Sequence, residues 1–482
     1  MKIHVDCTSV RGRYQDVTAW QNTTLRYTPP SDFPAYLAET LGRAKIMRVF
    51  ITLDEYWEIS DGSYYEDYEI GKARVPVEAR HYPYDWEKTV PAPSGTRFED
   101  YLTSHARAAD ELLLNVRRLE REVSDGIISY DTYAEVFGNA VRYCKRLAPN
   151  IKYIECCNEV DLATFGNLNA EEYVRIYLVA HRVIKELNEQ EGYEIPLQIG
   201  GYSAAFPISR WDLFCEVMRL LRESEIGDDP MDFYSYHHYE VANLRQMVSK
   251  GMIGIAEMSD IEKLKLIVGQ HHSLLASLEL PARPVFLDEL GRAKCTSVAA
   301  DCLYNAAGLL TYLIAVAKGA LGEGVYPFPW CTCHNPSYQI SYTQFLLNAD
   351  GSYAATPNGI ALMLLHRMQG DILETKIENA WGRDAEYRVL ATKSEDKLYL
   401  LCVNPTADIT ACHVTLSGLD DGSYRMTAYR CDEKKNNCVT GDGDGTLTAT
   451  TQKTLTAHNS TLQTNLVLER DHFVLLELQR EA

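Results

Sequence analysis

Residues 151–159 read IKYIECCNE, a short apolar strand pattern that ends in the polar pair Asn158-Glu159. Apolar, β-branched and aromatic residues dominate the first seven positions, as is typical of a buried strand. A helix pattern follows at residues 170–189, with Asn169 as the expected N-cap and Glu172 three residues later. A buried strand followed by a long helix predicts a βα unit, and repeated βα units build a parallel sheet.

The same unit recurs along most of the chain. We predict seven further strands, at residues 18–22, 46–52, 111–116, 196–201, 231–239, 284–290 and 324–330. Helix patterns accompany them, at residues 33–44, 98–109, 131–147, 210–223, 261–278, 297–318 and 360–368. Eight strands alternating with helices predict an α/β fold, a (β/α)₈ TIM barrel, which we place at residues 8–369.

Past residue 370 the pattern changes to short strands separated by turn residues. We expect strands at residues 387–392, 398–404, 411–416, 423–429, 446–450 and 472–478. This pattern predicts a C-terminal all-β sandwich domain over residues 370–482. A strand pattern at residues 2–6 precedes the barrel, and we expect it to pair into the same sandwich.

Composition and charge narrow the classes of partner. The 47 basic and 67 acidic residues leave a net charge of −20, which disfavours nucleic acid and anionic membranes as partners. The longest apolar stretch, residues 306–317, is too short to cross a bilayer and predicts a core helix. The first residues lack the apolar run of a signal peptide, so we expect a cytoplasmic protein. The 13 cysteines, an odd number, are expected as reduced buried thiols.

Glutamates follow two of the predicted barrel strands. Glu159 comes after the fourth strand, and Glu289 lies at the end of the seventh, PVFLDEL. Catalytic groups of such barrels sit at the carboxyl ends of the strands, so both carboxyls are expected in one pocket. A single glutamate is usually a surface ion-pairing residue, but two facing carboxyls are what glycoside hydrolysis requires. Two buried carboxyls also push each other's pKa values apart, which suits one acid and one nucleophile.

Three further side chains are expected near this pair. His237 and Tyr239 are two residues apart on one strand and therefore share a face, from which Tyr239 could donate a hydrogen bond to Glu289. His238 points the opposite way and is expected to be structural. Arg48 alternates with apolar neighbours on the second strand, so it either points inward to pair with Glu289 or forms an unrelated ion pair.

These motifs resemble those of clan A glycoside hydrolases. Asn158-Glu159 resembles the clan's acid/base motif, and residues 287–291, LDELG, resemble its strand-seven nucleophile motif. Residues 232–239, DFYSYHHY, are similar to the strand-six segment of family 39, the β-xylosidase and α-L-iduronidase family. Ser235, His237 and Tyr239 fill the Ser-x-His-x-Tyr pattern of that segment. Val160 stands where the family usually has proline after Asn-Glu.

The resemblance implies a retaining mechanism, with Glu289 as nucleophile and Glu159 as acid and then base. It implies that Asn158 hydrogen-bonds the 2-hydroxyl of the sugar. Trp330, at the end of the eighth strand, is then expected either as an apolar platform for the sugar or as rim packing. The nearest named activity is that of a β-xylosidase acting on an oligosaccharide or glycoside, and the resemblance also suggests a homo-oligomer.

The long segment after the second strand, residues 53–97, is rich in aromatic residues and includes Trp57 and Trp86. Loops of this length are usually functional, and one that blocks an end of the cleft would make the enzyme exo-acting.

The sequence predicts neither a metal nor a cofactor. Cys331-Thr-Cys333-His334 lacks a second ligand pair at zinc spacing, and residues 441–445 lack the glutamate of a calcium loop. Two alternatives stay open: a carbohydrate-binding pseudo-enzyme on the same barrel, and a clan A glycosidase of different sugar specificity. A barrel isomerase or aldolase is disfavoured because no predicted strand ends in lysine.

Overall fold

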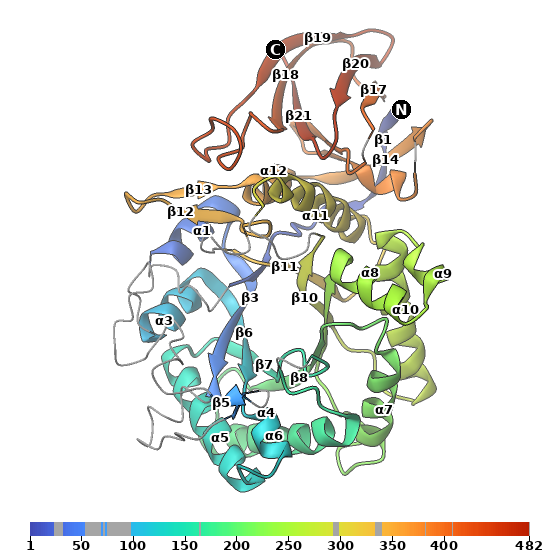
Figure 1. Ribbon diagram of the computed structural model, residues 1–482. Helices are drawn as coiled ribbons and strands as arrows, with labels where there is room; N and C mark the ends of the chain where they lie inside the picture. Colours follow the sequence, from blue (N-terminus) through green and yellow to red (C-terminus); the bar gives the residue numbers. More distant parts are fainter. Residues whose placement is uncertain are drawn as a thin grey trace.

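The computed structural model describes residues 1–23, 32–53, 69–70, 73–74, 98–162, 165–292, 298–332, 340–380, 382–406 and 408–481. Figure 1 looks into a barrel, with a β domain lying above it. The aromatic segment after the second predicted strand falls outside the described residues, apart from the backbone of β4 (Glu69–Ile70) and β5 (Ala73–Arg74). The expected closure of the cleft by this segment therefore lies outside them too.

Eight strands form the barrel sheet in the order β11-β10-β9-β8-β7-β6-β3-β2, and every neighbouring pair is parallel. Their bounds are β2 (Trp20–Asn22), β3 (Ala44–Thr52), β6 (Ala109–Arg117), β7 (Ile151–Cys156), β8 (Gln198–Ala204), β9 (Tyr234–Tyr239), β10 (Val285–Gly291) and β11 (Val325–Pro329). The backbone N–H of Thr332 donates to Asn22 O at 3.0 Å, which joins the two end strands and closes the ring. Each of the eight predicted strands overlaps one of these strands, so the predicted barrel is confirmed.

Helices surround the barrel (Figure 1). Eight of them match predicted helices: α1 (Phe33–Leu41), α3 (Phe98–Ala108), α5 (Tyr130–Leu147), α6 (Ala170–Glu191), α7 (Trp211–Arg222), α10 (Asp260–Ser277), α11 (Asp301–Ala317) and α12 (Pro357–Arg367). The predicted cap of α6 is confirmed: Asn169 Oδ1 accepts from Glu172 N at 2.9 Å, and Asn169 N donates to Glu172 Oε2 at 2.8 Å. α11 is buried along most of its length, as expected of a core helix. Within the described part of the chain, no helix has the length and apolarity that a bilayer crossing needs.

The sequence did not predict several short elements. These are α4 (Glu120–Ser124), α8 (Glu240–Ser249), α9 (Ile253–Ala256), the 3₁₀ helix η3 (Ala385–Arg388) and the hairpin of β12 (Phe345–Leu347) and β13 (Tyr353–Ala355). α8 begins directly after β9 and carries buried side chains only at Asn243 and Met247, so its helical periodicity is weak.

The barrel interior has two layers of different chemistry. The lower one, which we call the apolar layer, contains Ala19, Trp20, Ile46, Leu113, Tyr153, Phe233, Phe286 and Phe328. Two residues further along the chain, the same strands place fully buried polar side chains in what we call the polar layer: Arg48, Asn115, Glu155, Ser235 and Asp288. Because side chains alternate along a strand, a step of two residues stays on the inner face and moves toward the carboxyl ends.

The β domain is a nine-stranded sheet in the order β19-β18-β21-β16-β15-β14-β1-β17-β20. Its strands are β1 (Lys2–Arg13), β14 (Asp371–Glu378), β15 (Val389–Lys393), β16 (Lys397–Val403), β17 (Thr410–Ser417), β18 (Gly422–Cys431), β19 (Thr451–Ala457), β20 (Thr461–Leu468) and β21 (Phe473–Arg480). All nine contribute to one apolar core, and a tight turn joins the two edge strands, so the sheet curls over itself as a sandwich. The predicted C-terminal β domain is confirmed.

The strand at the start of the chain pairs into this sheet, as we expected. β1 lies antiparallel to β14 and parallel to β17. The strand predicted at residues 446–450 is wrong, since Asn436 Oδ1 accepts from Thr448 N at 2.8 Å and strand pairing begins only at Thr451. The sequence also missed β14 and β20, where polar residues interrupt the apolar pattern.

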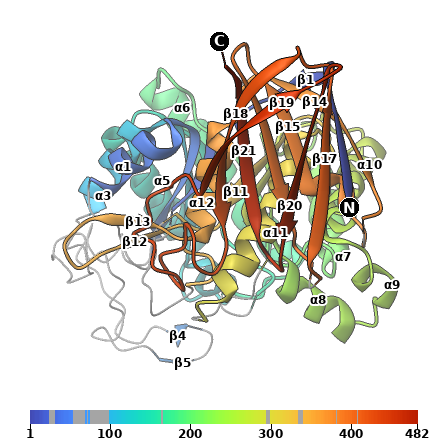
Figure 2. The same cartoon turned by 90° about the horizontal axis from the view of Figure 1, so that it is seen from above.

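The inner strands of the β domain are buried on both faces. Leu400 and Val474 face the sandwich core, while their neighbours Leu401 and Leu475 belong to the barrel core. Figures 1 and 2 show α11 and α12 between the sheet and the barrel. The β domain therefore shares a continuous core with the barrel.

Candidate active site

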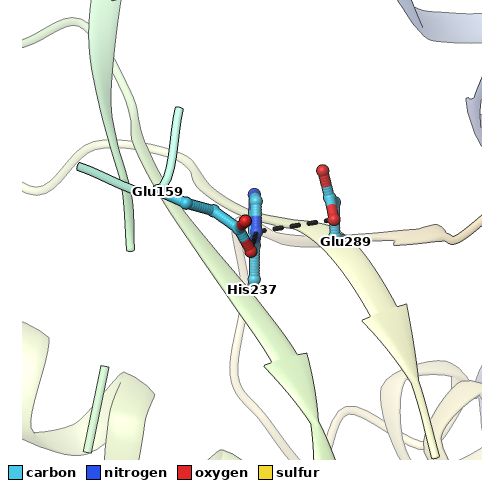
Figure 3. A group of neighbouring side chains, drawn as sticks. All are labelled: Glu159, His237 and Glu289. Carbon is cyan, nitrogen blue, oxygen red and sulfur yellow. Dashed lines mark hydrogen bonds and ion pairs between the residues drawn. The ribbon is translucent and has the colours of Figure 1, made fainter. Parts of the chain in front are cut away.

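The two candidate carboxylates come from β10 and from the loop after β7. Glu289 lies on β10, and Glu159 follows the end of β7. Cys157 and Glu159 have positive φ angles of 71° and 45°, so the chain turns sharply there. Glu159 N then donates to Ser203 O of β8 at 2.9 Å, which fixes the turn. Figure 3 shows the two carboxyl groups beside His237.

A β-bulge brings two adjacent acidic residues of β10 into the interior. Phe286 pairs with Ser235 and Glu289 pairs with His237, so β10 has one residue more than β9 between these pairs. Strict alternation would send Asp288 and Glu289 to opposite faces, but the extra residue re-aims the strand. Asp288 follows Phe286 by two residues and joins the polar layer, while the bulge turns Glu289 inward at its upper edge.

Glu289 accepts hydrogen bonds on both carboxylate oxygens. Arg48 Nη1 donates to Oε1 at 2.9 Å, and the Tyr239 hydroxyl donates to Oε2 at 2.6 Å. His237 Nδ1 lies 3.5 Å from Oε2. Burial alone would raise the pKa of Glu289, but His237 and Arg48, with the Tyr239 hydrogen bond, hold that pKa below its usual value. Glu289 is therefore held as a carboxylate.

Glu159 has the opposite tendency. Burial raises its pKa, and the negative charges of Glu289 and Asp161 add to this rise, while a hydrogen bond from His237 opposes it. That bond joins His237 Nδ1 to Glu159 Oε1 at 2.8 Å. The side chain of Glu159 is 14% exposed, compared with 9% for Glu289. Of the two facing carboxyls, Glu159 thus keeps its proton to the higher pH.

Arg48 lies fully buried at the centre of the polar layer. Its guanidinium is 2.8 Å from Glu155, 3.2 Å from Asp288 and 2.9 Å from Glu289. Of the two orientations that the sequence left open, Arg48 therefore has the inward one, and it pairs with Glu289. Arg48 Nη2 also donates to Asn158 Oδ1 at 2.9 Å. Because arginine only donates, this contact assigns the amide oxygen of Asn158 and leaves its Nδ2 to donate elsewhere.

Glu155 and Asp288 form a carboxyl pair around Arg48. Burial opposes the charge of Glu155, but Arg48 and a hydrogen bond from Asp288 lower its pKa to about 2. Burial and the charge of Glu155 raise the pKa of Asp288 well above its ordinary value. Of this pair, Asp288 therefore keeps its proton to the higher pH.

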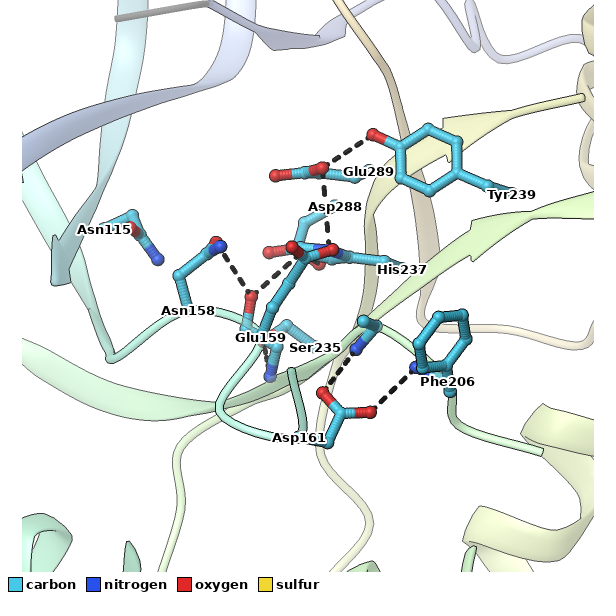
Figure 4. A network of polar contacts seen from close by, with 12 residues as sticks. Asn115, Asn158, Glu159, Asp161, Phe206, Ser235, His237, Tyr239, Asp288 and Glu289 are labelled. Atoms are coloured by element: carbon cyan, nitrogen blue, oxygen red, sulfur yellow. Dashed lines mark hydrogen bonds and ion pairs between the residues drawn. The ribbon is translucent and has the colours of Figure 1, made fainter. Parts of the chain in front are cut away.

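His237 and Tyr239 share the inner face of β9 (Figure 4). His237 Nε2 lies 2.9 Å from Ser203 Oγ while Nδ1 faces the two glutamates. Burial lowers the pKa of His237, but Glu289 and Glu159 outweigh this and raise it. His238 points away from the site, as predicted: it packs against the Tyr312 ring of α11 at 5.7 Å, and burial lowers its pKa to about 3.

Trp330 follows β11 and is partly exposed. Its ring meets Phe50 edge-on, with 6.1 Å between centroids, and Phe50 follows Arg48 by two residues on β3. Trp330 therefore lies on the barrel's upper rim, where it could serve as a platform or as packing. Trp57, Trp86, Cys333 and His334 lie outside the described residues.

Five residues of the site were not predicted from the sequence. Glu155 and Asn115 are polar residues inside apolar strands, and that contrast was a usable signal. Asp288 was not expected beside Glu289 because alternation allows only one of two adjacent residues on the inner face, and Ser203 carries no distinguishing pattern. Asp161 accepts from the backbone N–H groups of Ala205 and Phe206 at 2.9 and 3.0 Å, which pins the loop after β7 to the loop after β8 (Figure 4).

One group of possible metal ligands occurs among the described residues. Single ligand atoms of Glu159, His237 and Glu289 all lie within 4.8 Å of one another. The sequence showed no such cluster because the three residues come from separate strands. His237 Nδ1 lies 2.8 Å from Glu159 Oε1 and 3.5 Å from Glu289 Oε2.

No protein-family model matches the chain, and no curated protein matches it in sequence. Solved structures do match it. A GH39 enzyme from Xanthomonas axonopodis pv. citri superposes with a TM-score of 0.64 at 14% identity, over 100% of this chain and 97% of the other. A monomeric β-xylosidase from Caulobacter crescentus CB15 gives 0.63 at 15% identity over 100% of both chains. An α-L-arabinofuranosidase from Thermotoga maritima gives 0.57 at 15% identity, over 99% of both. The chain thus has the fold of GH39-like clan A glycoside hydrolases, over the barrel and the β domain together.

Proposed function

We propose that this protein is a retaining glycoside hydrolase, with Glu289 as nucleophile and Glu159 as acid/base. The observation that carries the proposal is the pair of buried carboxyls that face each other beside His237, Glu159 at 2.8 Å and Glu289 at 3.5 Å from its Nδ1. Their pKa values are displaced in opposite directions, which supports one acid and one nucleophile. Retaining enzymes place these groups about 5–5.5 Å apart, whereas inverting enzymes need roughly 6.5–9.5 Å to admit a water. One oxygen of Glu159 lies within 4.8 Å of one oxygen of Glu289, and this close approach supports the retaining arrangement.

In the first step, a Glu289 oxygen attacks the anomeric carbon as the bond to the leaving oxygen breaks. Glu159 gives its proton to that oxygen, and a glycosyl ester on Glu289 remains. In the second step, Glu159, now ionised, takes a proton from water as the water oxygen attacks the same carbon. The ester bond breaks, Glu289 leaves as a carboxylate, and both side chains return to their starting charge.

The neighbours of Glu289 suit this exchange of charge. Tyr239 and Arg48 stabilise the free carboxylate of Glu289. Their hydrogen bonds weaken as Glu289 loses its negative charge on forming the ester with the sugar. Asn158, held by Arg48 through its oxygen, is oriented to donate its Nδ2 to the sugar 2-hydroxyl. Trp330 at the rim would give the sugar an apolar face to rest on.

We propose exo action on an oligosaccharide or aryl glycoside, with β-xylosides as the first substrates to try. The likeness to a β-xylosidase supports this choice, while the glucosidase and arabinofuranosidase among the similar structures keep other sugars open. A pseudo-enzyme is the competing reading, and both carboxyls together with their supporting contacts argue against it.

The test is a panel of aryl glycosides: β-xyloside, β-glucoside, β-galactoside, α-arabinoside and β-glucuronide. We expect turnover of at least one member and a loss of kcat/KM on the order of 10⁴-fold in Glu289→Gln. Glu159→Gln should lose about 10²–10⁴-fold in kcat/KM, and less with an activated leaving group that needs no proton.

Azide rescue distinguishes the roles of the two glutamates. The cavity left in Glu289→Ala should admit azide and yield a glycosyl azide of inverted configuration, whereas Glu159→Ala with azide should give the retained anomer. Turnover that survives in both glutamine variants would remove this pair from the chemistry, and a wild type that binds sugars without turnover would favour the pseudo-enzyme.

A further inference from the structure

Arg292, just past the end of β10, contacts three parts of the molecule. Its Nε donates to Glu240 Oε2 at 2.8 Å, in the first turn of α8. Its Nη1 donates to Pro405 O at 3.3 Å and lies 3.9 Å from Asp471 Oδ1, and both of these residues belong to the β domain. The guanidinium also stacks on the Tyr304 ring of α11, 4.1 Å from the centroid.

The helix beneath Arg292 is shaped to receive it. A Cβ on Gly308 of α11 would lie 2.0 Å from Arg292 Cδ and 2.7 Å from its Cβ, so only glycine leaves room for the arginine stem. Arg292 N donates to Asn305 Oδ1 of the same helix at 2.7 Å. The Arg292 side chain is only 14% exposed, so its position is defined by packing as well as by charge.

Arg292 is close in the chain to the residues that hold the candidate nucleophile. Glu240, its ion-pair partner, directly follows Tyr239, whose hydroxyl donates to Glu289. Val241 N donates to Arg292 O at 3.4 Å, so the backbones after β9 and β10 also meet here. Arg292 thus joins the end of the Tyr239 strand to the end of the Glu289 strand, from the side of the β domain.

We propose that Arg292 is a positioning residue through which the β domain holds the Tyr239 hydroxyl against Glu289. Arg292 touches neither substrate nor the reacting atoms. The inference rests on the proposed function and adds to it a task for the β domain: a catalytic hydrogen bond depends on Pro405 and Asp471, which lie outside the barrel.

Several titratable groups face Glu289 and Arg292, and they determine which limb of a pH profile reports on Glu289. Glu289 is faced by Arg48, His237, Tyr239, Glu159 and Asp288. Arg292 is faced by Glu240, Asp260, Tyr304, Tyr312, Arg388 and Asp471, and Lys263 lies 3.6 Å from Asp260. Burial and the charge of Glu240 raise the pKa of Asp260 to about 7. Asp260 therefore titrates well above Glu289, and a change in the acidic limb of a pH profile reports on Glu289.

The matched control is Arg367, a second arginine that joins the barrel to the β domain. From α12 it donates to Glu477 Oε1 at 2.8 Å and to the Tyr429 hydroxyl at 3.0 Å, and it stacks on the Tyr429 ring. It has the same kinds of partner as Arg292 but is joined to neither catalytic strand. Both Arg292→Met and Arg367→Met should lower the melting temperature, so stability alone does not distinguish them.

The experiment compares pH profiles of kcat/KM for these two variants. In Arg292→Met the acidic limb should move to higher pH by roughly one unit, because a loosened Tyr239 no longer favours the Glu289 carboxylate. In Arg367→Met it should stay in place. Arg292→Lys should recover part of the shift, and Gly308→Ala, which displaces the arginine stem, should reproduce part of it if Arg292→Met does not fold. An unmoved acidic limb in Arg292→Met, or an equal shift in Arg367→Met, overturns the proposal.

Two further measurements separate positioning from charge and from the proposed function. The double variant Arg292→Met/Glu240→Gln restores the local charge balance but not the contact, so positioning predicts that the shift persists and simple charge loss predicts that it disappears. The pKa of Glu289 can also be followed without turnover, as the ¹³C-carboxyl signal that Glu289→Gln removes from glutamate-labelled protein. If the pKa of Glu289 rises in Arg292→Met but the protein hydrolyses no glycoside, the positioning role of Arg292 stands and the proposed hydrolase activity is rejected. If that pKa is unchanged and the enzyme is active, the hydrolase activity stands and the positioning role is rejected.

Discussion

The apolar and polar layers of the barrel interior lie on the same strands, two residues apart, yet they do different work. Phe286 in the apolar layer stacks on Phe233 with 4.9 Å between centroids, and no charge is involved. Asp288, two residues on, meets a buried arginine and a second carboxyl. Aromatic packing contributes free energy of folding, whereas a buried ion network contributes little net stability and much orientation. Packing that stabilises this barrel and side chains that suit its chemistry are therefore separated along the strand direction.

The largest effect is expected from breaking the polar layer at its centre. Arg48→Met should destabilise the protein by about 3–5 kcal/mol, because it leaves Glu155 buried without its cation. It should also reduce kcat/KM on the order of 10³-fold, since Asn158 and Glu289 both lose a donor. Urea unfolding and aryl glycoside kinetics on the same preparation measure the two losses. A variant that is as stable and active as wild type would show that the layer does not work as a unit.

The apolar layer should respond in stability alone. Phe233 is fully buried between Tyr153 and Phe286, so Phe233→Ala should cost about 3–5 kcal/mol of unfolding free energy. Its kcat/KM per folded molecule should stay within a few-fold of wild type at temperatures well below unfolding. If Phe233→Ala lost as much kcat/KM per folded molecule as Arg48→Met, the two layers would not differ in function.

At the upper edge of the polar layer, Glu289 and Glu159 should set the pH dependence of activity. Glu289 must be ionised to attack and Glu159 protonated to donate, so activity should fall as pH drops through the pKa of Glu289 and as it rises through that of Glu159. Tyr239→Phe removes a hydrogen bond to a charged acceptor, worth about 1.5–3 kcal/mol, and should move the acidic limb up by about 1–2 units. A limb that moves down instead would mean that another group titrates there.

The smallest effect is expected at Asp288, one of the two carboxyls of the polar layer beside Arg48. Burial and the charge of Glu155 raise the pKa of Asp288 and favour its neutral form. Asp288→Asn, which is neutral and of similar size, should therefore change the unfolding free energy by less than about 1 kcal/mol near neutral pH. Glu155→Gln removes an ionised partner of Arg48 and should lower the unfolding free energy by about as much as Arg48→Met does. The stability contributed by Glu155 is present above its unfolded pKa and declines as pH falls toward about 2. Equal losses in the two amide variants would mean that both groups are ionised.

The sequence predicted the barrel and most of its site because those features follow simple periodicities. Alternation placed His237 and Tyr239 on one face and left two orientations open for Arg48, and strand ends located Glu159 and Glu289. Asp288 was missed because alternation allows only one of two adjacent residues on the inner face, and the prediction gave that place to Glu289. The bulge that admits both leaves no mark in a short apolar strand. The false strand at residues 446–450 arose because a side chain, Asn436, takes the backbone N–H that a strand would use.

The position of β1 between β14 and β17 has a consequence for the order in which the chain is made. A ribosome that has passed Arg13 has synthesised β1 but none of its partners, the first of which begins at Asp371. At about 5–20 residues per second, β1 waits roughly 20–70 s as an unpaired strand while the whole barrel emerges. Its eventual insertion joins β14 to β17, which otherwise expose two open edges. The β domain is thus the last part of the molecule that can assemble, and a fragment starting at residue 370 would lack the strand that completes its sheet.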